Sequence, residues 1–155
     1  MTYSLGRQSR QNLIGVHPKL VDVVERAIDL SEQDFTVFEG LRTVERQREY
    51  VKKGVSKTMN SKHLKQADGY GHAVDLVPYI DGTARWEWGP IYEVAAAMCQ
   101  AAKEQGTLLT WGGAWDRRIN GMDCVASRMK AEVEQYCARH PGPDFIDGPH
   151  YELVV

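Results

Sequence analysis

Three short segments carry side chains that together could bind a catalytic metal ion. The first contains His63, the second contains Asp75, and the third contains Asp147 followed three positions later by His150. Two histidines and one carboxylate bind zinc through nitrogen and oxygen, and they leave the fourth tetrahedral position open for a water molecule. Three protein ligands are typical of a catalytic zinc rather than a structural one. The sequence therefore predicts one Zn²⁺ per chain, with His63, Asp75 and His150 as its ligands.

The segments around two of these residues have the pattern of β-strands. Asp75 lies in the run 73–77, where alternate side chains of a buried strand would share one face. His150 begins a second apolar run, 150–155. If the two strands pair, they bring Asp75 and His150 to one metal ion, and His63 arrives from the preceding loop.

These residues resemble the zinc-dependent D-Ala-D-Ala carboxypeptidase and L-alanyl-D-glutamate endopeptidase family, which includes VanX, VanY and phage endolysins. The family has the motif S-x-H-x-x-G-x-A-x-D and, far downstream, an acidic residue three positions before a histidine. The matching residues are Ser61, His63, Gly71, Ala73, Asp75, Asp147 and His150. Further similarity at 15–20, 39–42 and 111–113 extends the resemblance over nearly the whole chain.

The chain departs from the family pattern at one place. His63 and Gly71 are eight positions apart, where the family usually has three, so we expect a five-residue insertion at about 65–70. Its composition, Gln-Ala-Asp-Gly-Tyr, favours a surface loop rather than a broken site. A second, longer insertion is expected at about 116–144.

The resemblance implies a peptidoglycan stem-peptide endopeptidase that cuts L-Ala–D-Glu, in a phage or prophage endolysin. It also implies that Arg42 contacts the substrate or steadies the developing oxyanion, as a fixed cation near the carbonyl would. An enzymatic alternative is a D,D-carboxypeptidase or dipeptidase of the same family. The alternative from another class is a non-catalytic, zinc-stabilised binding module, because the scaffold also resembles the signalling domain of hedgehog proteins.

Asp147 and Glu152 are the two candidates for the general base. A water that attacks a peptide carbonyl must lose a proton and the amine leaving group must gain one. The turn after Asp147 contains Gly148 and Pro149, and it can hold this carboxylate beside the metal without ligating it. Glu152 would share the strand face of His150, where we expect it to support that ligand as a hydrogen-bond acceptor. We therefore predict Asp147 as the catalytic base.

Each candidate also has an ordinary structural explanation. Taken alone, His63 would be a surface histidine, Asp75 half of a buried salt bridge, and Arg42 a surface arginine at a helix terminus. The combined pattern favours the metal site over these explanations. Trp111, Trp115 and Tyr151 could line a cleft, although aromatic residues in so small a domain are more often core. Strand alternation turns His72 away from the face of Asp75, and His17 and His140 adjoin prolines in turn-like segments, where we expect structural or solvated histidines.

The rest of the sequence predicts helices interleaved with short strands. After a polar leader at residues 1–10, helices are expected from Pro18 to near Ser31, from a Thr43 cap to Lys53, from Pro90 to Gln105 and across 125–137. Strands are expected at 35–38, 73–77, 107–111 and 150–155. This order predicts an α+β fold, a single domain over residues 1–155 with a small antiparallel sheet and flanking helices, similar to hedgehog and DD-peptidases.

The composition of the chain argues against nucleic acid and membranes as binding partners. The chain has 155 residues, with 19 basic and 21 acidic side chains, so no overall field attracts nucleic acid. No segment has the apolar length of a membrane span or a signal peptide. We therefore expect a monomer that stays in the host cytoplasm until release and then acts on the cell wall in the periplasm. The three cysteines lack metal-site spacing and are expected to be reduced and mostly buried.

Overall fold

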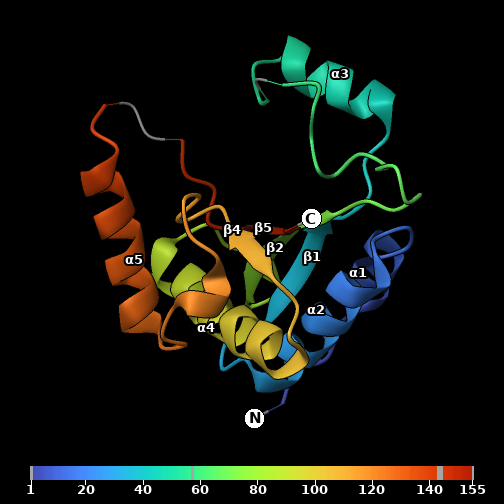
Figure 1. Ribbon diagram of the computed structural model, residues 1–155. Coiled ribbons are helices and arrows are strands. Elements are labelled where there is room, and N and C mark those ends of the chain that lie inside the picture. The colour runs from blue at the N-terminus through green and yellow to red at the C-terminus, as the bar shows by residue number, and fades with distance from the viewer. Residues whose placement is uncertain (1, 57, 143–144, 155) are drawn as a thin grey trace.

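An antiparallel sheet lies at the centre of the molecule, with helices packed around it (Figure 1). The structure is a computed structural model that describes residues 2–56, 58–142 and 145–154. Its elements are α1 (Arg7–Asn12), α2 (Pro18–Leu30), β1 (Phe35–Glu39), α3 (Val44–Lys52), β2 (Ala73–Ile80), β3 (Thr83–Ala84), α4 (Trp88–Gln105), β4 (Leu109–Trp111), the short 3-10 helix η1 (Ile119–Gly121), α5 (Ala126–Arg139) and β5 (His150–Leu153). The strand order is β1-β2-β5-β4, and β3 extends β2 as a hairpin.

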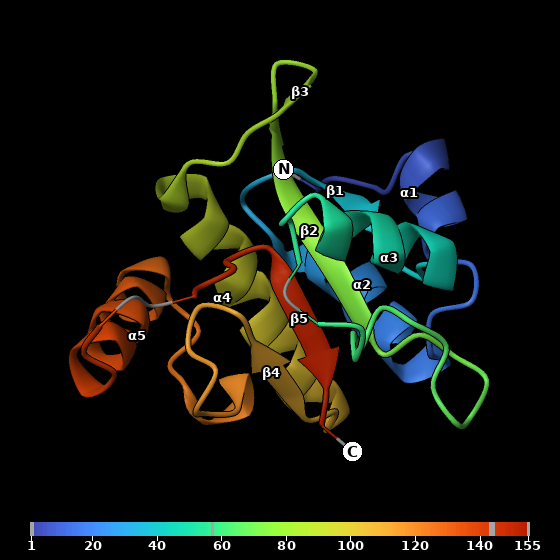
Figure 2. The ribbon, with the colours of Figure 1, turned by 90° about the horizontal axis from the view of Figure 1, so that it is seen from above.

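Helices α2 and α4 cover one face of this sheet, while α3 lies on the opposite side (Figure 1). Seen from above, α4 runs beneath β4 and β5, and α5 lies beside it (Figure 2). Pro18 begins α2 because its fixed φ suits the first helical position. Gly106 ends α4 with a φ of 65°, the left-handed conformation that caps helices. None of the helices in the described ranges is long and apolar enough to cross a membrane.

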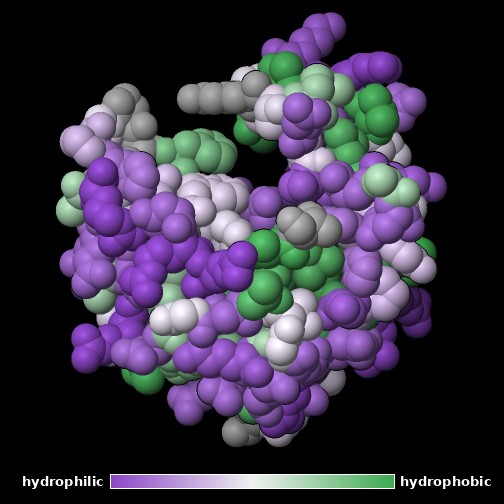
Figure 3. Space-filling view, in the orientation of Figure 1, coloured by the Kyte–Doolittle hydropathy of each residue, from purple (hydrophilic) through white to green (hydrophobic). Residues whose placement is uncertain are grey.

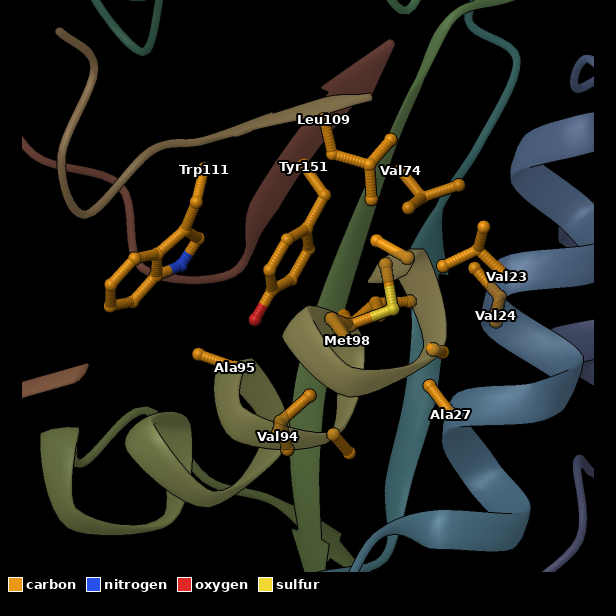
Figure 4. Close-up of a cluster of buried hydrophobic side chains, with 14 of the residues drawn as sticks. Val23, Val24, Ala27, Val74, Val94, Ala95, Met98, Leu109, Trp111 and Tyr151 are labelled. Atoms are coloured by element: carbon orange, nitrogen blue, oxygen red, sulfur yellow. The ribbon is translucent and has the colours of Figure 1, made fainter. Parts of the chain in front are cut away.

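Strand alternation separates the core from the predicted site. Val74 of β2 is the partner of Tyr151 of β5, and both side chains are fully buried with Trp111 against α4 (Figure 4). The next pair along the same two strands is Asp75 and His150. Because successive side chains of a strand point to opposite faces, Asp75 and His150 lie on the face away from the α2 and α4 core.

Most of the expected elements are present, with shifted ends. The Thr43 hydroxyl accepts a hydrogen bond from the Arg46 backbone N–H, so the expected cap of α3 is confirmed. Helix α4 begins at Trp88, two residues before Pro90. The expectation of a polar leader at residues 1–10 was wrong in part, because residues 7–12 form α1. Ser9 of that helix is buried and accepts a hydrogen bond from Val37 N–H.

Two ends of the expected elements lie partly outside the described residues. The long segment expected as a second insertion contains η1 and α5, and its residues 143–144 are outside the described ranges. The last expected strand is β5, which ends at Leu153, and Val155 is outside the described ranges as well.

Residues 65–71 form a small hairpin that closes on itself. Lys65 bridges Gly71, and the Gln66 N–H donates to the Tyr70 carbonyl at 2.8 Å. The Asp68 carboxylate lies 2.7 Å from Nε2 of His72 and ties the tip of the hairpin to the base of β2. The loop therefore leaves the sheet and returns without separating His63 from β2.

The cysteines are less uniformly buried than expected. Cys99 on α4 is buried, whereas Cys124 and Cys137 are partly exposed. Burial and the neighbouring Cys124 thiol raise the pKa of Cys99 well above its ordinary value. Cys99 is therefore a weak nucleophile at neutral pH.

Candidate active site

The three predicted ligands meet at the end of the β2–β5 pair. Oδ1 of Asp75 lies 3.2 Å from Nε2 of His63 and 3.2 Å from Nδ1 of His150. One ligand atom from each residue lies within 4.8 Å of the others. Asp75 and His150 come from paired strands, and His63 comes from the loop before β2, as the sequence predicted.

Backbone contacts fix the orientation of the His63 ring. Its Nδ1 donates to the carbonyl oxygen of Gly40 at 2.8 Å, and a carbonyl can only accept. The proton of a neutral His63 therefore sits on Nδ1, and the lone pair of Nε2 points at Asp75. The loop itself is held because Ser61 Oγ accepts from His63 N–H and the His63 carbonyl accepts from Arg42 N–H.

Glu152 fixes the second histidine in the same way. Nε2 of His150 lies 2.8 Å from Oε1 of Glu152, so the neutral ring keeps its proton on Nε2 and its lone pair on Nδ1. A carboxylate bonded to the outer nitrogen of a metal-binding histidine is a common supporting arrangement. Glu152 occupies the supporting position that we expected for it.

The resulting donor set fits a metal cation. Two imidazole lone pairs and one carboxylate oxygen converge, and three acceptors at one point require a proton or a cation between them. Burial lowers the pKa of His150, but hydrogen bonds with Asp75 and Glu152 outweigh it and raise that pKa to about 10. Burial alone would raise the pKa of Asp75, yet its hydrogen bonds with His150 and His63 hold it well below its usual range.

Asp147 lies beside these residues without joining the cluster. It lines the same cleft as His63, Asp75 and His150. Burial, and then the negative charge of Asp75, raise the pKa of Asp147. Its backbone is fixed by Gly112, since the Asp147 N–H donates to the Gly112 carbonyl at 2.8 Å. A β-carbon at Gly112 would come within 2.1 Å of the Asp147 carbonyl oxygen, so this close approach requires glycine.

Arg42 is buried at the edge of the site. Its Nε donates to Glu39 Oε1 at 2.8 Å, and its Nη1 donates to Gln47 Oε1 at 2.6 Å. Its Nη2 lies 4.0 Å from Oδ2 of Asp75. The surface-arginine alternative is therefore wrong, because one edge of the guanidinium is anchored and the other faces the ligands. The Glu39 and Gln47 anchors were not assigned from sequence, although the E-x-x-R spacing of Glu39 and Arg42 is a signal that could have indicated a pair.

The site opens into a cleft of about 440 Å³. The space-filling view shows the molecule hollowed at its upper edge, between α3 on one side and the end of α5 on the other (Figure 3). Trp115 lies in this cleft, and its ring centroid is 5.2 Å from that of His150. Trp111 and Tyr151 are core residues, as expected.

The remaining histidines lie outside the cleft. His17 and His72 line a separate cavity of about 910 Å³, together with Asp68. His17 Nδ1 accepts the Lys19 N–H at the start of α2, and His140 contacts the backbone carbonyl of residue 136 at the end of α5. These placements agree with the structural roles expected for them.

Comparison with known proteins agrees with this geometry. The family model described as phage L-alanyl-D-glutamate peptidase matches residues 1–154. The chain belongs to that family. It is 35% identical over 120 residues to the L-alanyl-D-glutamate peptidase of Escherichia phage T5, covering 75% of this chain and 84% of the relative.

A solved member of the same enzyme class has the same fold. The crystal structure of the Serratia marcescens L-Ala D-Glu endopeptidase ChiX superposes with a TM-score of 0.71 at 34% identity, covering 99% of this chain and 90% of that chain. The resemblance inferred from the sequence and the predicted α+β fold are both confirmed.

Proposed function

We propose that this chain is a zinc-dependent peptidoglycan endopeptidase that hydrolyses the L-Ala–D-Glu bond of the stem peptide. The observation that carries the proposal is the convergence of two histidine lone pairs and the Asp75 carboxylate in an open cleft. The choice of bond is supported by membership of the phage L-alanyl-D-glutamate peptidase family and by the names of the T5 and Serratia relatives.

His63, Asp75 and His150 hold the metal in this proposal. A zinc ion held by these three residues would supply the chemistry of a Lewis acid, which lowers the pKa of water and polarises a carbonyl group. The Gly40 carbonyl and the Glu152 carboxylate keep both histidines in the tautomer that presents a lone pair to the metal.

Asp147 transfers the proton. Its carboxylate accepts a proton from the attacking water and returns it to the amine of the leaving D-Glu. The raised pKa suits this exchange, because a more basic carboxylate binds the proton more readily. The fixed backbone at Gly112 keeps Asp147 beside the metal ligands.

Arg42 supplies a fixed positive charge to the substrate. Two of its nitrogens are held by Glu39 and Gln47, so little side-chain entropy is lost when the remaining edge binds. That edge either receives a stem-peptide carboxylate or steadies the oxyanion. All of these residues come from one chain, so a monomer carries the complete site. The enzyme acts on the bacterial cell wall in lysis by a phage or prophage.

Digestion of purified peptidoglycan tests the proposal. Mass spectrometry of the products should show new N-terminal D-Glu without release of free D-Ala. The matched control is zinc-loaded Asp147→Asn protein, which should release product at a rate lower by on the order of 100-fold or more. Free D-Ala as the main product would establish the D,D-carboxypeptidase alternative, and a zinc-loaded protein that releases nothing would instead be a binding module.

A further inference from the structure

Two exposed aromatic side chains form a pair on the wall of the active-site cleft. Phe38 of β1 and Trp86, in the loop between β3 and α4, have ring centroids 5.2 Å apart at an interplanar angle of 81°. Their exposed fractions are 48% and 54%. Both line the cleft that contains His63, Asp75 and His150. Large aromatic surfaces left open beside a catalytic site mark a place where a ligand binds.

The pair lies close to the reaction centre. Phe38 directly precedes Glu39, and Glu39 is the partner of Asp75 across the β1–β2 ladder. The register of the β1–β2 ladder shifts between Val37 and Glu39, so Phe38 lies at this irregularity, directly beside the Glu39–Asp75 pair and on the order of 6 Å from Asp75 in backbone terms. A group bound on the aromatic pair is therefore within about two residues of the bond that is cut.

The stem peptide offers little extended apolar surface next to the scissile bond. Its residues near the scissile bond are alanine, glutamate and a diamino acid, which carry small or charged side chains. The L-Ala nitrogen forms an amide with the lactyl carboxyl of N-acetylmuramic acid, so the sugar ring begins roughly 7 Å from the scissile carbonyl. The C–H faces of a pyranose ring are the extended apolar surface at that distance, and C–H groups are attracted to the negative face of an aromatic ring.

The local charges agree with a neutral ligand. Arg85 and Glu87 flank Trp86 and form an ion pair with each other, with Arg85 Nε 2.9 Å from Glu87 Oε1. Their charges therefore largely cancel beside the indole. The cationic edge of Arg42 lies toward Asp75, where the charged peptide would bind.

We propose that Phe38 and Trp86 form a saccharide platform that binds the N-acetylmuramyl ring on the N-terminal side of the scissile bond. The inference rests on the proposed endopeptidase function and adds that the enzyme recognises the glycan as well as the peptide. The platform favours uncut, glycan-attached stem peptides over free peptides of the same sequence.

Two substrates that differ only in the sugar test the platform. One carries N-acetylmuramic acid on the L-Ala nitrogen, and the other carries an acetyl group there. Trp86→Ala should lower kcat/KM for the muramyl substrate about 5- to 10-fold, mainly through KM, and change it less than about twofold for the acetyl substrate. Phe38→Ala should do the same to a smaller extent, and Trp86→Phe should retain part of the preference. Ile14→Ala, which removes an exposed apolar side chain outside the cleft, is the matched control and should change neither.

Binding of the product N-acetylmuramyl-L-alanine gives a readout that does not depend on turnover. Its titration should shift the indole N–H resonance of Trp86, assigned with Trp86→Phe, and Trp86→Ala should weaken binding to the same degree as it raises KM. Equal losses on both substrates, or no loss on either, would overturn the platform. If the wild type cleaves neither substrate, the endopeptidase proposal fails, and the product titration still decides whether the platform binds sugar.

Discussion

Asp75 and His150 are direct partners across the antiparallel β2–β5 ladder, and Oδ1 of Asp75 lies 3.2 Å from Nδ1 of His150. This register puts both side chains on the face opposite the buried pair Val74 and Tyr151. A slip of one residue would exchange core and site faces. The apolar core that fixes the register therefore also fixes the metal ligands.

The three converging residues should be needed for zinc binding. The variants should each bind less than one zinc ion per chain: His63→Ala, Asp75→Ala and His150→Ala. The loss in zinc affinity should exceed the roughly 10–100-fold that is lost when a hydrogen-bond partner of a metal ligand is removed. Elemental analysis after dialysis measures the occupancy. His72→Ala is the control, because His72 is buried but lies in the other cavity, and it should keep its zinc. Full zinc retention in all three ligand variants would refute the metal site.

Glu152 should influence the metal through His150. Glu152→Gln keeps a hydrogen-bond acceptor but removes the charge that polarises the ring. We expect the protein to fold and to bind zinc about 10-fold more weakly, measured by competition with a chelator. With zinc saturated, most of the activity should return. If saturated Glu152→Gln is inactive while Asp147→Asn retains activity, the roles of the two carboxylates are exchanged.

The sequence predicts a structural feature well when the residues that determine the feature are close together in the chain. The alternation around Asp75 and the run beginning at His150 are local, and they predicted both strands and the shared face. The two contacts that hold Arg42 are harder to predict from the sequence, because the Gln47 contact depends on how α3 is placed relative to the loop after β1. Helix α1 is short and polar, and it is held by a contact from Ser9 to β1 that no local periodicity reveals.

The ion pair between Asp116 and Arg139 of α5 should make stability depend on pH. Hydrogen bonds from Arg139 hold the pKa of Asp116 below its ordinary value, with both contacts at 2.9 Å. A depressed carboxyl pKa stabilises the fold above the unfolded-state pKa of about 3.9, and this stabilisation is lost as the pH falls through the folded-state value.

Asp116→Asn should therefore lower Tm by about 1–3 °C at pH 7, the scale of a largely exposed pair in a domain of this size. The difference from wild type should shrink as the pH is lowered past about 4, measured by calorimetry. Glu134→Gln removes the weaker, more exposed pair with Lys130 and should change Tm less. A Tm difference that is the same at every pH would show that the Asp116 charge is not responsible.

Arg42 should affect stability and turnover separately. Arg42→Ala leaves the buried Glu39 carboxylate without its main partner, so the free energy of unfolding should fall by about 3 kcal/mol or more. Arg42→Lys keeps the charge but cannot bond Glu39 and Gln47 while also facing the site. We expect it to fold and bind zinc, with kcat/KM reduced on the order of 10-fold. Unchanged kcat/KM in Arg42→Lys would limit the arginine to a structural role.

Asp147 should act on the proton and leave the metal in place. Asp147→Asn preserves the shape of the side chain but removes its basicity, so zinc occupancy should stay at one per chain while kcat falls on the order of 100-fold or more. Steady-state kinetics and elemental analysis on the same preparation separate the two effects.

Gly112→Ala tests the role of Asp147 without changing its side chain. The new β-carbon would collide with the Asp147 carbonyl and displace the segment that holds the carboxylate. We expect it to lower activity with less effect on zinc than the ligand variants. Loss of zinc from Asp147→Asn would instead make Asp147 a ligand, and the proton transfer would have to be assigned to Glu152.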